Sequence, residues 1–237
     1  MELFTSEALL NLFTLTTLEI VLGIDNVIFI ALLVQHLEKE RRNKARIMGL
    51  SLALIMRILM LFSATWIMKL TEPLFTVFKF AISGRSLLLI IGGLFLVVKS
   101  ILEIVEMFHK PDEKNKDKPS KRVSYFKIIT QIIFIDIILS FDSIITAVGI
   151  SNNFSIMVIA IVIAMIIMLV ASNAIGKFIY ANPSIKVVAL AFIAFLGVIL
   201  VLGGIDIEVN KAYLYFAMLF AAIVETINIS LRKTHGH

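Results

Sequence analysis

The chain has 237 residues, of which 59% are hydrophobic and 16% charged, and its formal net charge is +5. Soluble domains carry about 25% charged residues, so this composition excludes an ordinary water-soluble protein and indicates lipid as the solvent. Cysteine is absent, which excludes disulfide bonds, thiolate metal sites and thiol chemistry. The basic residues lie between apolar runs, where lipid headgroups and membrane orientation explain them, so no nucleic-acid partner is expected.

Long apolar runs recur along the chain, and each approaches the roughly 20 residues that a helix needs to cross a bilayer. We predict an all-α, polytopic membrane protein with about seven transmembrane helices, near residues 8–35, 47–69, 84–108, 125–150, 155–180, 184–205 and 211–231. The first run has no basic leading segment and no cleavage site, so it is expected to stay as a membrane helix. Gly92 and Gly93 in the third run indicate close packing against another helix.

One stretch, residues 109–124, is typical of a polar linker, because it is densely charged and contains two prolines. Apart from Arg57 and Lys99, the Lys and Arg residues lie in the connections, at the ends of the runs and in the C-terminal tail, and they divide sixteen to four between the two sides. The richer side, which includes the linker, is predicted to face the cytoplasm. We therefore expect a bacterial cytoplasmic (inner) membrane protein with its N-terminus outside and its C-terminus inside. Residues 1–237 form a single transmembrane domain with a first repeat at 8–108, a second at 125–205 and an extra helix at 211–231.

The parts of the chain on the two sides of the linker share a motif. Residues 19–28 (EIVLGIDNVI) align with residues 136–145 (DIILSFDSII), with acids, aliphatic residues and small residues in register at an offset of 117. Because an odd number of runs, three, separates the copies, the halves enter the membrane in opposite directions. This predicts a 3+3 inverted repeat plus one C-terminal helix, and transporters of this kind bind their substrates near the midplane, often on broken helices.

Eight charged residues lie at membrane depth, where charge is costly enough that a functional role is the default interpretation. Six are acids and two are bases: Glu19, Asp25, Glu103, Asp136, Asp142, Glu225, Arg57 and Lys99. Two bases cannot neutralise six acids, so we expect protons, a metal cation, or both to do so.

Some of these charges have simpler interpretations. Lys99 and Glu103 are four residues apart on one helix face, so an ordinary ion pair competes with a role in a proton path. Arg57 cannot lose its proton and is expected to be a fixed counter-ion to one motif carboxylate. Glu225 and Asn228 are three apart and either extend the site, form a proton path or form an interhelical hydrogen-bonded pair.

The spacing within each motif leaves two arrangements open. On an unbroken helix Glu19 and Asp25 are about 120° apart, so either the helix breaks between them, at Gly23, or each acid contacts a different neighbour. An inverted twofold is expected to bring the two motif aspartates together at mid-membrane. The predicted ligands are all oxygen donors: Glu19, Asp25, Asn26, Asp136, Asp142 and Ser143. Such a shell suits Mg²⁺, Ca²⁺ or Mn²⁺ as a substrate, with no permanently bound cofactor.

At EIVLGIDNVIF (residues 19–29) and DIILSFDSIITAVG (residues 136–149) the sequence resembles the TerC family of integral membrane proteins, in the superfamily of the lysine exporter LysE. It is most similar to the stand-alone bacterial branch. Further resemblance lies at Met56-Arg57, Gly92–Leu96, Asn182–Ser184 and Tyr215–Met218. The resemblance implies a seven-helix fold and, for several members, manganese export with the intramembrane acids as the metal site. Chloroplast members are linked to thylakoid membrane-protein assembly.

We therefore expect a secondary transporter that exports a divalent cation, Mn²⁺ above others, in exchange for protons. No nucleotide-binding or hydrolase motif is present, so the chain is not expected to be an enzyme. The alternative is a membrane scaffold that assists the insertion or metalation of other proteins; an amino-acid exporter would need more fixed positive charge than Arg57 supplies. Expected partners are the lipid bilayer, the cation and protons, with a second copy of the chain or another membrane protein as further candidates.

Overall fold

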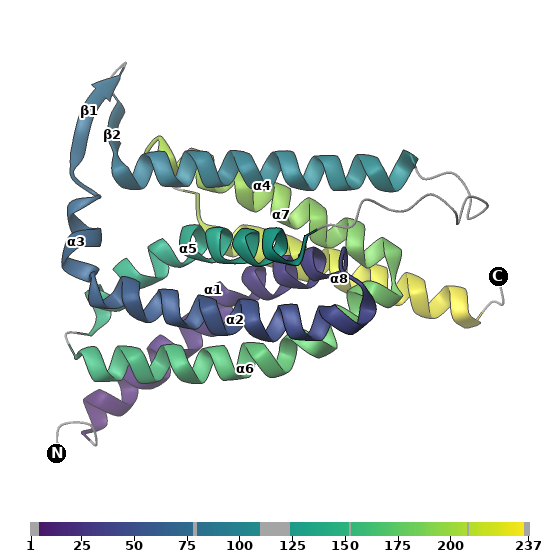
Figure 1. The fold of residues 1–237 in the computed structure, drawn as a ribbon, viewed down its shortest axis with the longest axis horizontal. Helices are drawn as coiled ribbons and strands as arrows, with labels where there is room; N and C mark the ends of the chain where they lie inside the picture. Colours follow the sequence, from purple (N-terminus) through teal and green to yellow (C-terminus); the bar gives the residue numbers. More distant parts are fainter. Residues whose placement is uncertain (1–4, 78–79, 110–123, 152, 208, 235–237) are drawn as a thin grey trace. The chain divides into compact units, whose positions relative to one another are not determined.

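A computed structural model describes residues 5–77, 80–109, 124–151, 153–207 and 209–234 (Figure 1). The helices in these residues are α1 (Ser6–Val34), α2 (Lys39–Phe62), α3 (Ala64–Lys69), α4 (Gly84–His109), α5 (Tyr125–Ile150), α6 (Phe154–Ala181), α7 (Pro183–Gly204) and α8 (Lys211–Thr234). All of them except α3 are long and apolar enough to cross a membrane. The predicted all-α fold with seven membrane helices is therefore confirmed, while residues 110–123 of the predicted linker lie outside the described residues.

The second span differs from its prediction of residues 47–69. Helix α2 begins at Lys39 and ends at Phe62, because the Lys, Arg and Glu residues that precede the apolar run are themselves good helix formers. At Ser63 the backbone leaves the α conformation, with φ −91° and ψ 15°, and α3 starts as a separate short helix. A two-stranded antiparallel hairpin follows, formed by β1 (Pro73–Val77) and β2 (Phe80–Ser83), which the sequence analysis did not predict.

Polar residues at the helix starts explain where several helices begin. The Thr5 hydroxyl accepts a hydrogen bond from the Ala8 N–H at the start of α1. The Asn153 side-chain oxygen accepts from the N–H groups of Ser155 and Ile156 at the start of α6. Such side chains satisfy N–H groups that have no partner inside the helix. Pro183 occupies the first turn of α7, where its missing N–H costs nothing.

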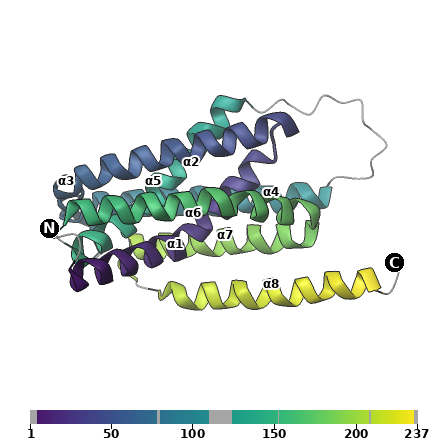
Figure 2. The same ribbon diagram turned by 90° about the horizontal axis from the view of Figure 1, so that it is seen from below.

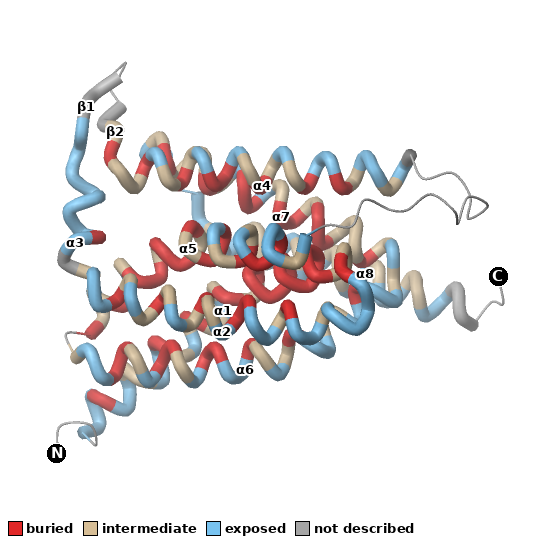
Figure 3. The backbone as a smooth tube through the Cα atoms, viewed as in Figure 1, coloured by how far each residue is buried: buried red, intermediate tan, exposed pale blue. Residues whose placement is uncertain are grey.

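One compact unit consists of residues 1–72 and 120–177 and contains α1, α2, α3, α5 and the larger part of α6. Helix α5 packs against both α1 and α2. All residues from Asp25 to Val34 of α1 are buried (Figure 3), as expected for a helix surrounded by other helices. The ring of Phe62 meets the ring of Phe154 on α6 edge to face, with centroids 5.1 Å apart.

The other compact unit consists of residues 73–119 and 178–237 and contains the hairpin, α4, α7 and α8. Helices α4 and α7 approach closely: a Cβ placed on Gly93 would lie 2.5 Å from the carbonyl oxygen of Gly197. The predicted close packing at Gly93 is therefore confirmed. Helix α8 runs alongside α7 (Figure 2), where Tyr215 packs near Phe192. None of its residues from 211 to 231 is buried, which suits a helix that faces lipid.

Candidate functional site

Three helices of the first unit bring buried charged side chains together. Glu19 lies on α1, Arg57 on α2 and Asp136 on α5, and each residue is 2 to 3% exposed. They meet because α5 is in contact with both α1 and α2. The two carboxylates occupy equivalent positions in the two copies of the motif, so a single guanidinium joins the copies.

The Arg57 guanidinium uses its fork to hold both carboxylates. Its Nη1 donates to Oε2 of Glu19 at 2.6 Å, and its Nη2 donates to Oδ1 of Asp136 at 3.0 Å. Its Nε adds a longer hydrogen bond to the same Asp136 oxygen at 3.3 Å. A planar guanidinium suits such contacts better than an ammonium does. Arg57 therefore pairs with two motif carboxylates, where the sequence analysis assigned it one.

Asn26 extends this network, and some buried acceptors of the two motifs have no hydrogen-bond partner among the described residues. Its Nδ2 donates to Oδ1 of Asp136 at 3.2 Å, so its own oxygen points away from that carboxylate. Among the described residues, Oδ1 of Asn26, Oε1 of Glu19 and the hydroxyl of Ser140 are buried without a hydrogen-bond partner. Buried acceptors of this kind are costly, and they would be stabilised by a proton donor, water or a cation.

Two of the other predicted ligands form hydrogen bonds within their own helices. Asp25, 4% exposed, accepts the N–H of Asn26 through Oδ1 at 2.9 Å. The Ser143 hydroxyl donates to the backbone carbonyl of Ser140 at 3.1 Å, and Asp142 is half-buried. Across the part of the chain that the structure describes, no group of three or more His, Cys, Asp or Glu side chains converges as a metal site would. The predicted ligand set therefore stays a prediction.

Of the two arrangements that the motif spacing left open, the structure has the one without a break in the motif helices. Helix α1 runs unbroken through Gly23, and α5 runs unbroken through Ser140. Glu19 contacts Arg57 on another helix, and Asp25 accepts the N–H of the next residue of its own helix, so the two acids have different partners. One glycine in an otherwise helical sequence is tolerated when neighbouring helices support the segment.

In the second unit Glu103 is the buried acid, 7% exposed. Lys99, one turn earlier on α4, lies 3.8 Å from its Oε2, so the spacing indicated a real ion pair. Its shorter partner is Lys186 of α7, whose Nζ donates to Oε1 at 2.9 Å. Lys186 and Glu103 are 83 residues apart in the sequence, so no spacing along the chain could have linked them.

Glu225 and Asn228 lie in the same unit on α8. Asn228 Nδ2 donates to Oε2 of Glu225 at 3.4 Å, while Oε1 of Glu225 is buried without a hydrogen-bond partner among the described residues. The contact that the structure gives for this pair is within one helix, and its role in the site, in a proton path or in an interhelical hydrogen bond stays a prediction.

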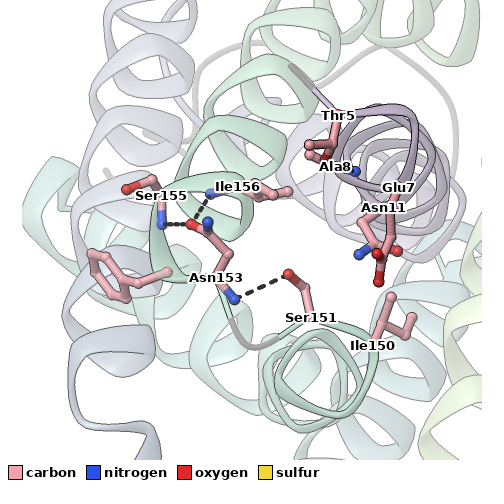
Figure 4. Close-up of a pocket in the computed structure, with 10 residues that line it drawn as sticks. Thr5, Glu7, Ala8, Asn11, Ile150, Ser151, Asn153, Ser155 and Ile156 are labelled. Carbon is pink, nitrogen blue, oxygen red and sulfur yellow. Dashed lines mark hydrogen bonds between the residues drawn. The ribbon is translucent and has the colours of Figure 1, made fainter. Parts of the chain in front are cut away.

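A pocket of about 540 Å³ opens at one end of the first unit (Figure 4). Glu7 and Asn11 line it from α1, and Ser151 and Asn153 line it from the connection between α5 and α6. Asn153 is held in place because its N–H donates to the Ser151 hydroxyl at 3.2 Å. The lining is thus rich in oxygen atoms, and it lies at the end of α1 opposite the fully buried segment.

Comparison with known proteins places this architecture in a family. The sequence profile of the integral membrane protein TerC family matches residues 4–235. A UPF0053 protein of Haemophilus influenzae is 48% identical over 96% of this chain and 95% of its own length. The UPF0053 inner membrane protein YgdQ of Escherichia coli K12 is 46% identical over 95% of this chain and 94% of its own length.

Another relative is longer. The UPF0053 inner membrane protein YoaE of Escherichia coli K12 is 42% identical over 94% of this chain, and the match covers 43% of YoaE. No solved structure matches the chain significantly. The chain belongs to the TerC family of integral membrane proteins.

Proposed function

We propose that this protein is a secondary transporter that exports a divalent cation, Mn²⁺ above others, in exchange for protons. The observation that carries the proposal is the charge of the first unit: at membrane depth its helices hold four carboxyl groups, from Glu19, Asp25, Asp136 and Asp142, and one guanidinium, from Arg57. Uncompensated charge at membrane depth is too costly to be retained without a role. A mobile cation that alternates with protons would compensate it.

The available donors favour a hard cation. Carboxylate oxygens of Glu19 and Asp136 contact Arg57, buried amide and hydroxyl oxygens of Asn26 and Ser140 lie on the same motif helices, and the chain has no cysteine. Its four histidines, His36, His109, His235 and His237, lie at helix ends or near the C-terminus. Oxygen donors without imidazole or sulfur suit Mg²⁺, Ca²⁺ and Mn²⁺, and the family resemblance favours Mn²⁺ among these.

The pocket beside Glu7 suits the exit of such a pathway. It lies at the N-terminal end of α1, the end that the distribution of Lys and Arg predicts to be outside. Asn11 is eight residues from Glu19 on the same helix, which is about 12 Å along the helix axis. A released cation would then pass an oxygen-lined vestibule.

The test is metal flux in proteoliposomes containing the purified full-length chain, with Mn²⁺, Ca²⁺, Mg²⁺ and Zn²⁺ as substrates and a pH reporter inside. Asp25→Asn and Asp142→Asn should each lower flux, because each removes a charged oxygen ligand. Mutation of residues that only hydrogen-bond to the ligands of a metal typically lowers metal affinity or activity roughly 10–100-fold. Loss of a ligand should cost no less, so we expect flux to fall at least about tenfold.

Asp206→Asn is the matched control. Asp206 is exposed in the connection between α7 and α8 and has φ 59°, a left-handed conformation that asparagine tolerates. This variant should transport like the parent. Full activity of both motif variants would contradict the proposed metal site. Absence of flux for all four cations in the parent would favour the scaffold alternative.

A further inference from the structure

The guanidinium of Arg57 occupies the space between the two carboxylates that a transported cation would use. It contacts Oε2 of Glu19 at 2.6 Å and Oδ1 of Asp136 at 3.0 Å, and all three side chains are almost fully buried. With the guanidinium there, both motif carboxylates have a positive partner, although its single charge offsets only one of their two negative charges. Glu19 and Asp136 cannot ligate a metal ion together unless Arg57 withdraws from at least one of them.

Simultaneous occupation by Arg57 and a metal ion is unfavourable for two reasons. A divalent cation in contact with the same carboxylate would be repelled by the guanidinium a few ångströms away, and repulsion between buried charges is screened only weakly. The geometry also conflicts, because Arg57 donates to Asp136 through both Nε and Nη2, which directs the carboxylate towards the arginine.

Two oxygen atoms of the groups that the Arg57 network holds are available to an incoming cation. Oε1 of Glu19 and Oδ1 of Asn26 are buried acceptors without a hydrogen-bond partner among the described residues. Each belongs to a group whose other polar atom is held within the arginine network, through Arg57 itself or through Asp136. Asp25 also attracts the guanidinium electrostatically, so a third acid from the motifs contributes to its retention.

From this geometry we propose that Arg57 is a built-in competitor of the substrate cation and thereby sets its affinity. The inference rests on the proposed transport function. Arg57 holds Glu19 and Asp136 when no metal is bound, and the incoming divalent cation displaces it from one or both. A monovalent cation would replace the guanidinium at equal charge and gain little, whereas a divalent cation compensates both carboxylates. Arg57 therefore favours divalent over monovalent cations.

The experiment measures Mn²⁺ binding and Mn²⁺ flux on the same purified full-length variants. Binding is followed by the loss of the free Mn²⁺ signal in electron paramagnetic resonance, and flux is followed in proteoliposomes. Arg57→Gln removes the competitor, so its Kd for Mn²⁺ should fall at least about tenfold. Its maximal flux should fall as well, because no internal cation displaces the metal or neutralises the carboxylates after release.

Arg57→Lys keeps the charge but loses the fork that engages two carboxylates. It should bind Mn²⁺ more tightly than the parent and less tightly than Arg57→Gln. Arg41→Gln is the matched control on the same helix, since Arg41 is 62% exposed and makes only a 3.6 Å surface ion pair with Glu38. It should match the parent in both measurements.

Tighter binding with slower flux distinguishes competition from a structural role, which would weaken binding and folding together. If Arg57→Gln and Arg57→Lys stay monodisperse but bind Mn²⁺ no better than the parent, Arg57 does not compete with the cation. That result leaves the proposed transport function unaffected. If Arg57→Gln fails to fold, Arg57→Lys decides, and an unchanged Kd for it overturns the inference. If the parent neither binds nor moves any divalent cation, the proposed function itself fails.

Discussion

Two lysines approach Glu103, and they differ in distance and in access to water. Lys186 lies 2.9 Å from the carboxylate and its side chain is 18% exposed, whereas Lys99 lies 3.8 Å away and is 34% exposed. Removing the partner of a buried charge is expensive because the remaining charge is left without compensation. An exposed ion pair contributes little because water screens it and both side chains lose freedom.

Lys186→Ala should therefore destabilise the protein more than Lys99→Ala. We expect roughly 2–3 kcal/mol for Lys186, somewhat below the value for a fully buried pair, and about 0–1 kcal/mol for Lys99. Thermal unfolding in detergent, reported as Tm, is the measurement. Equal Tm values for the two variants would show that Lys186 is not the main partner of Glu103.

Helices α4 and α7 form their closest contact through reciprocal glycines. A Cβ on Gly93 would meet the carbonyl oxygen of Gly197 and the side chain of Val201, and a Cβ on Gly197 would meet the carbonyl oxygen of Gly93 and the side chain of Val97. This symmetric pattern is that of an antiparallel pair related by a local twofold. It agrees with the inverted repeat that the duplicated motif predicts, in which α4 and α7 are equivalent helices.

Gly93→Ala should separate these helices, since the obstacle is backbone at 2.5 Å rather than a flexible side chain. Overpacking typically costs about 1–3 kcal/mol, so the Tm should fall clearly. Gly149→Ala on α5 is the control, because a Cβ there meets nothing within 4 Å. A Tm for Gly93→Ala equal to that of the control would mean that the crossing is looser than the structure shows.

At the scale of the whole molecule, the membrane orientation is predicted from the charged connections. The predicted cytoplasmic side carries most of the Lys and Arg residues, which resist translocation. Ser124 is exposed and precedes the first residue of α5. Ser155 is exposed at the start of α6, a few residues after the last residue of α5, so the two serines lie at opposite ends of α5. The two serines therefore report on opposite sides of the membrane.

The absence of cysteine makes this prediction directly testable. Ser155→Cys should react with an impermeant thiol reagent in whole cells, whereas Ser124→Cys should react only after the membrane is opened. Labelling in permeabilised cells provides the control for side-chain access. The reverse pattern, with Ser124→Cys labelled in whole cells, would invert the orientation and place the Glu7 pocket on the cytoplasmic side.

The sequence by itself determined the number of membrane helices and the duplicated acidic motif. A run of apolar residues predicts a span because the bilayer requires local length and apolarity, and neither depends on neighbouring helices. The same locality explains the Lys99–Glu103 pair, which needs only helical spacing. The end of α2 at Ser63 was missed because the residues on both sides of it are apolar enough to continue a span.

Only the tertiary structure decided which charges meet. Arg57 holds Glu19 and Asp136 at once because α5 packs against both α1 and α2, and no period along one helix encodes that packing. The same holds for Asn26 with Asp136 and for Lys186 with Glu103, which are distant in sequence. The unbroken course of α1 also depends on its surroundings, since helices packed on the segment around Gly23 offset the weak helix propensity of glycine.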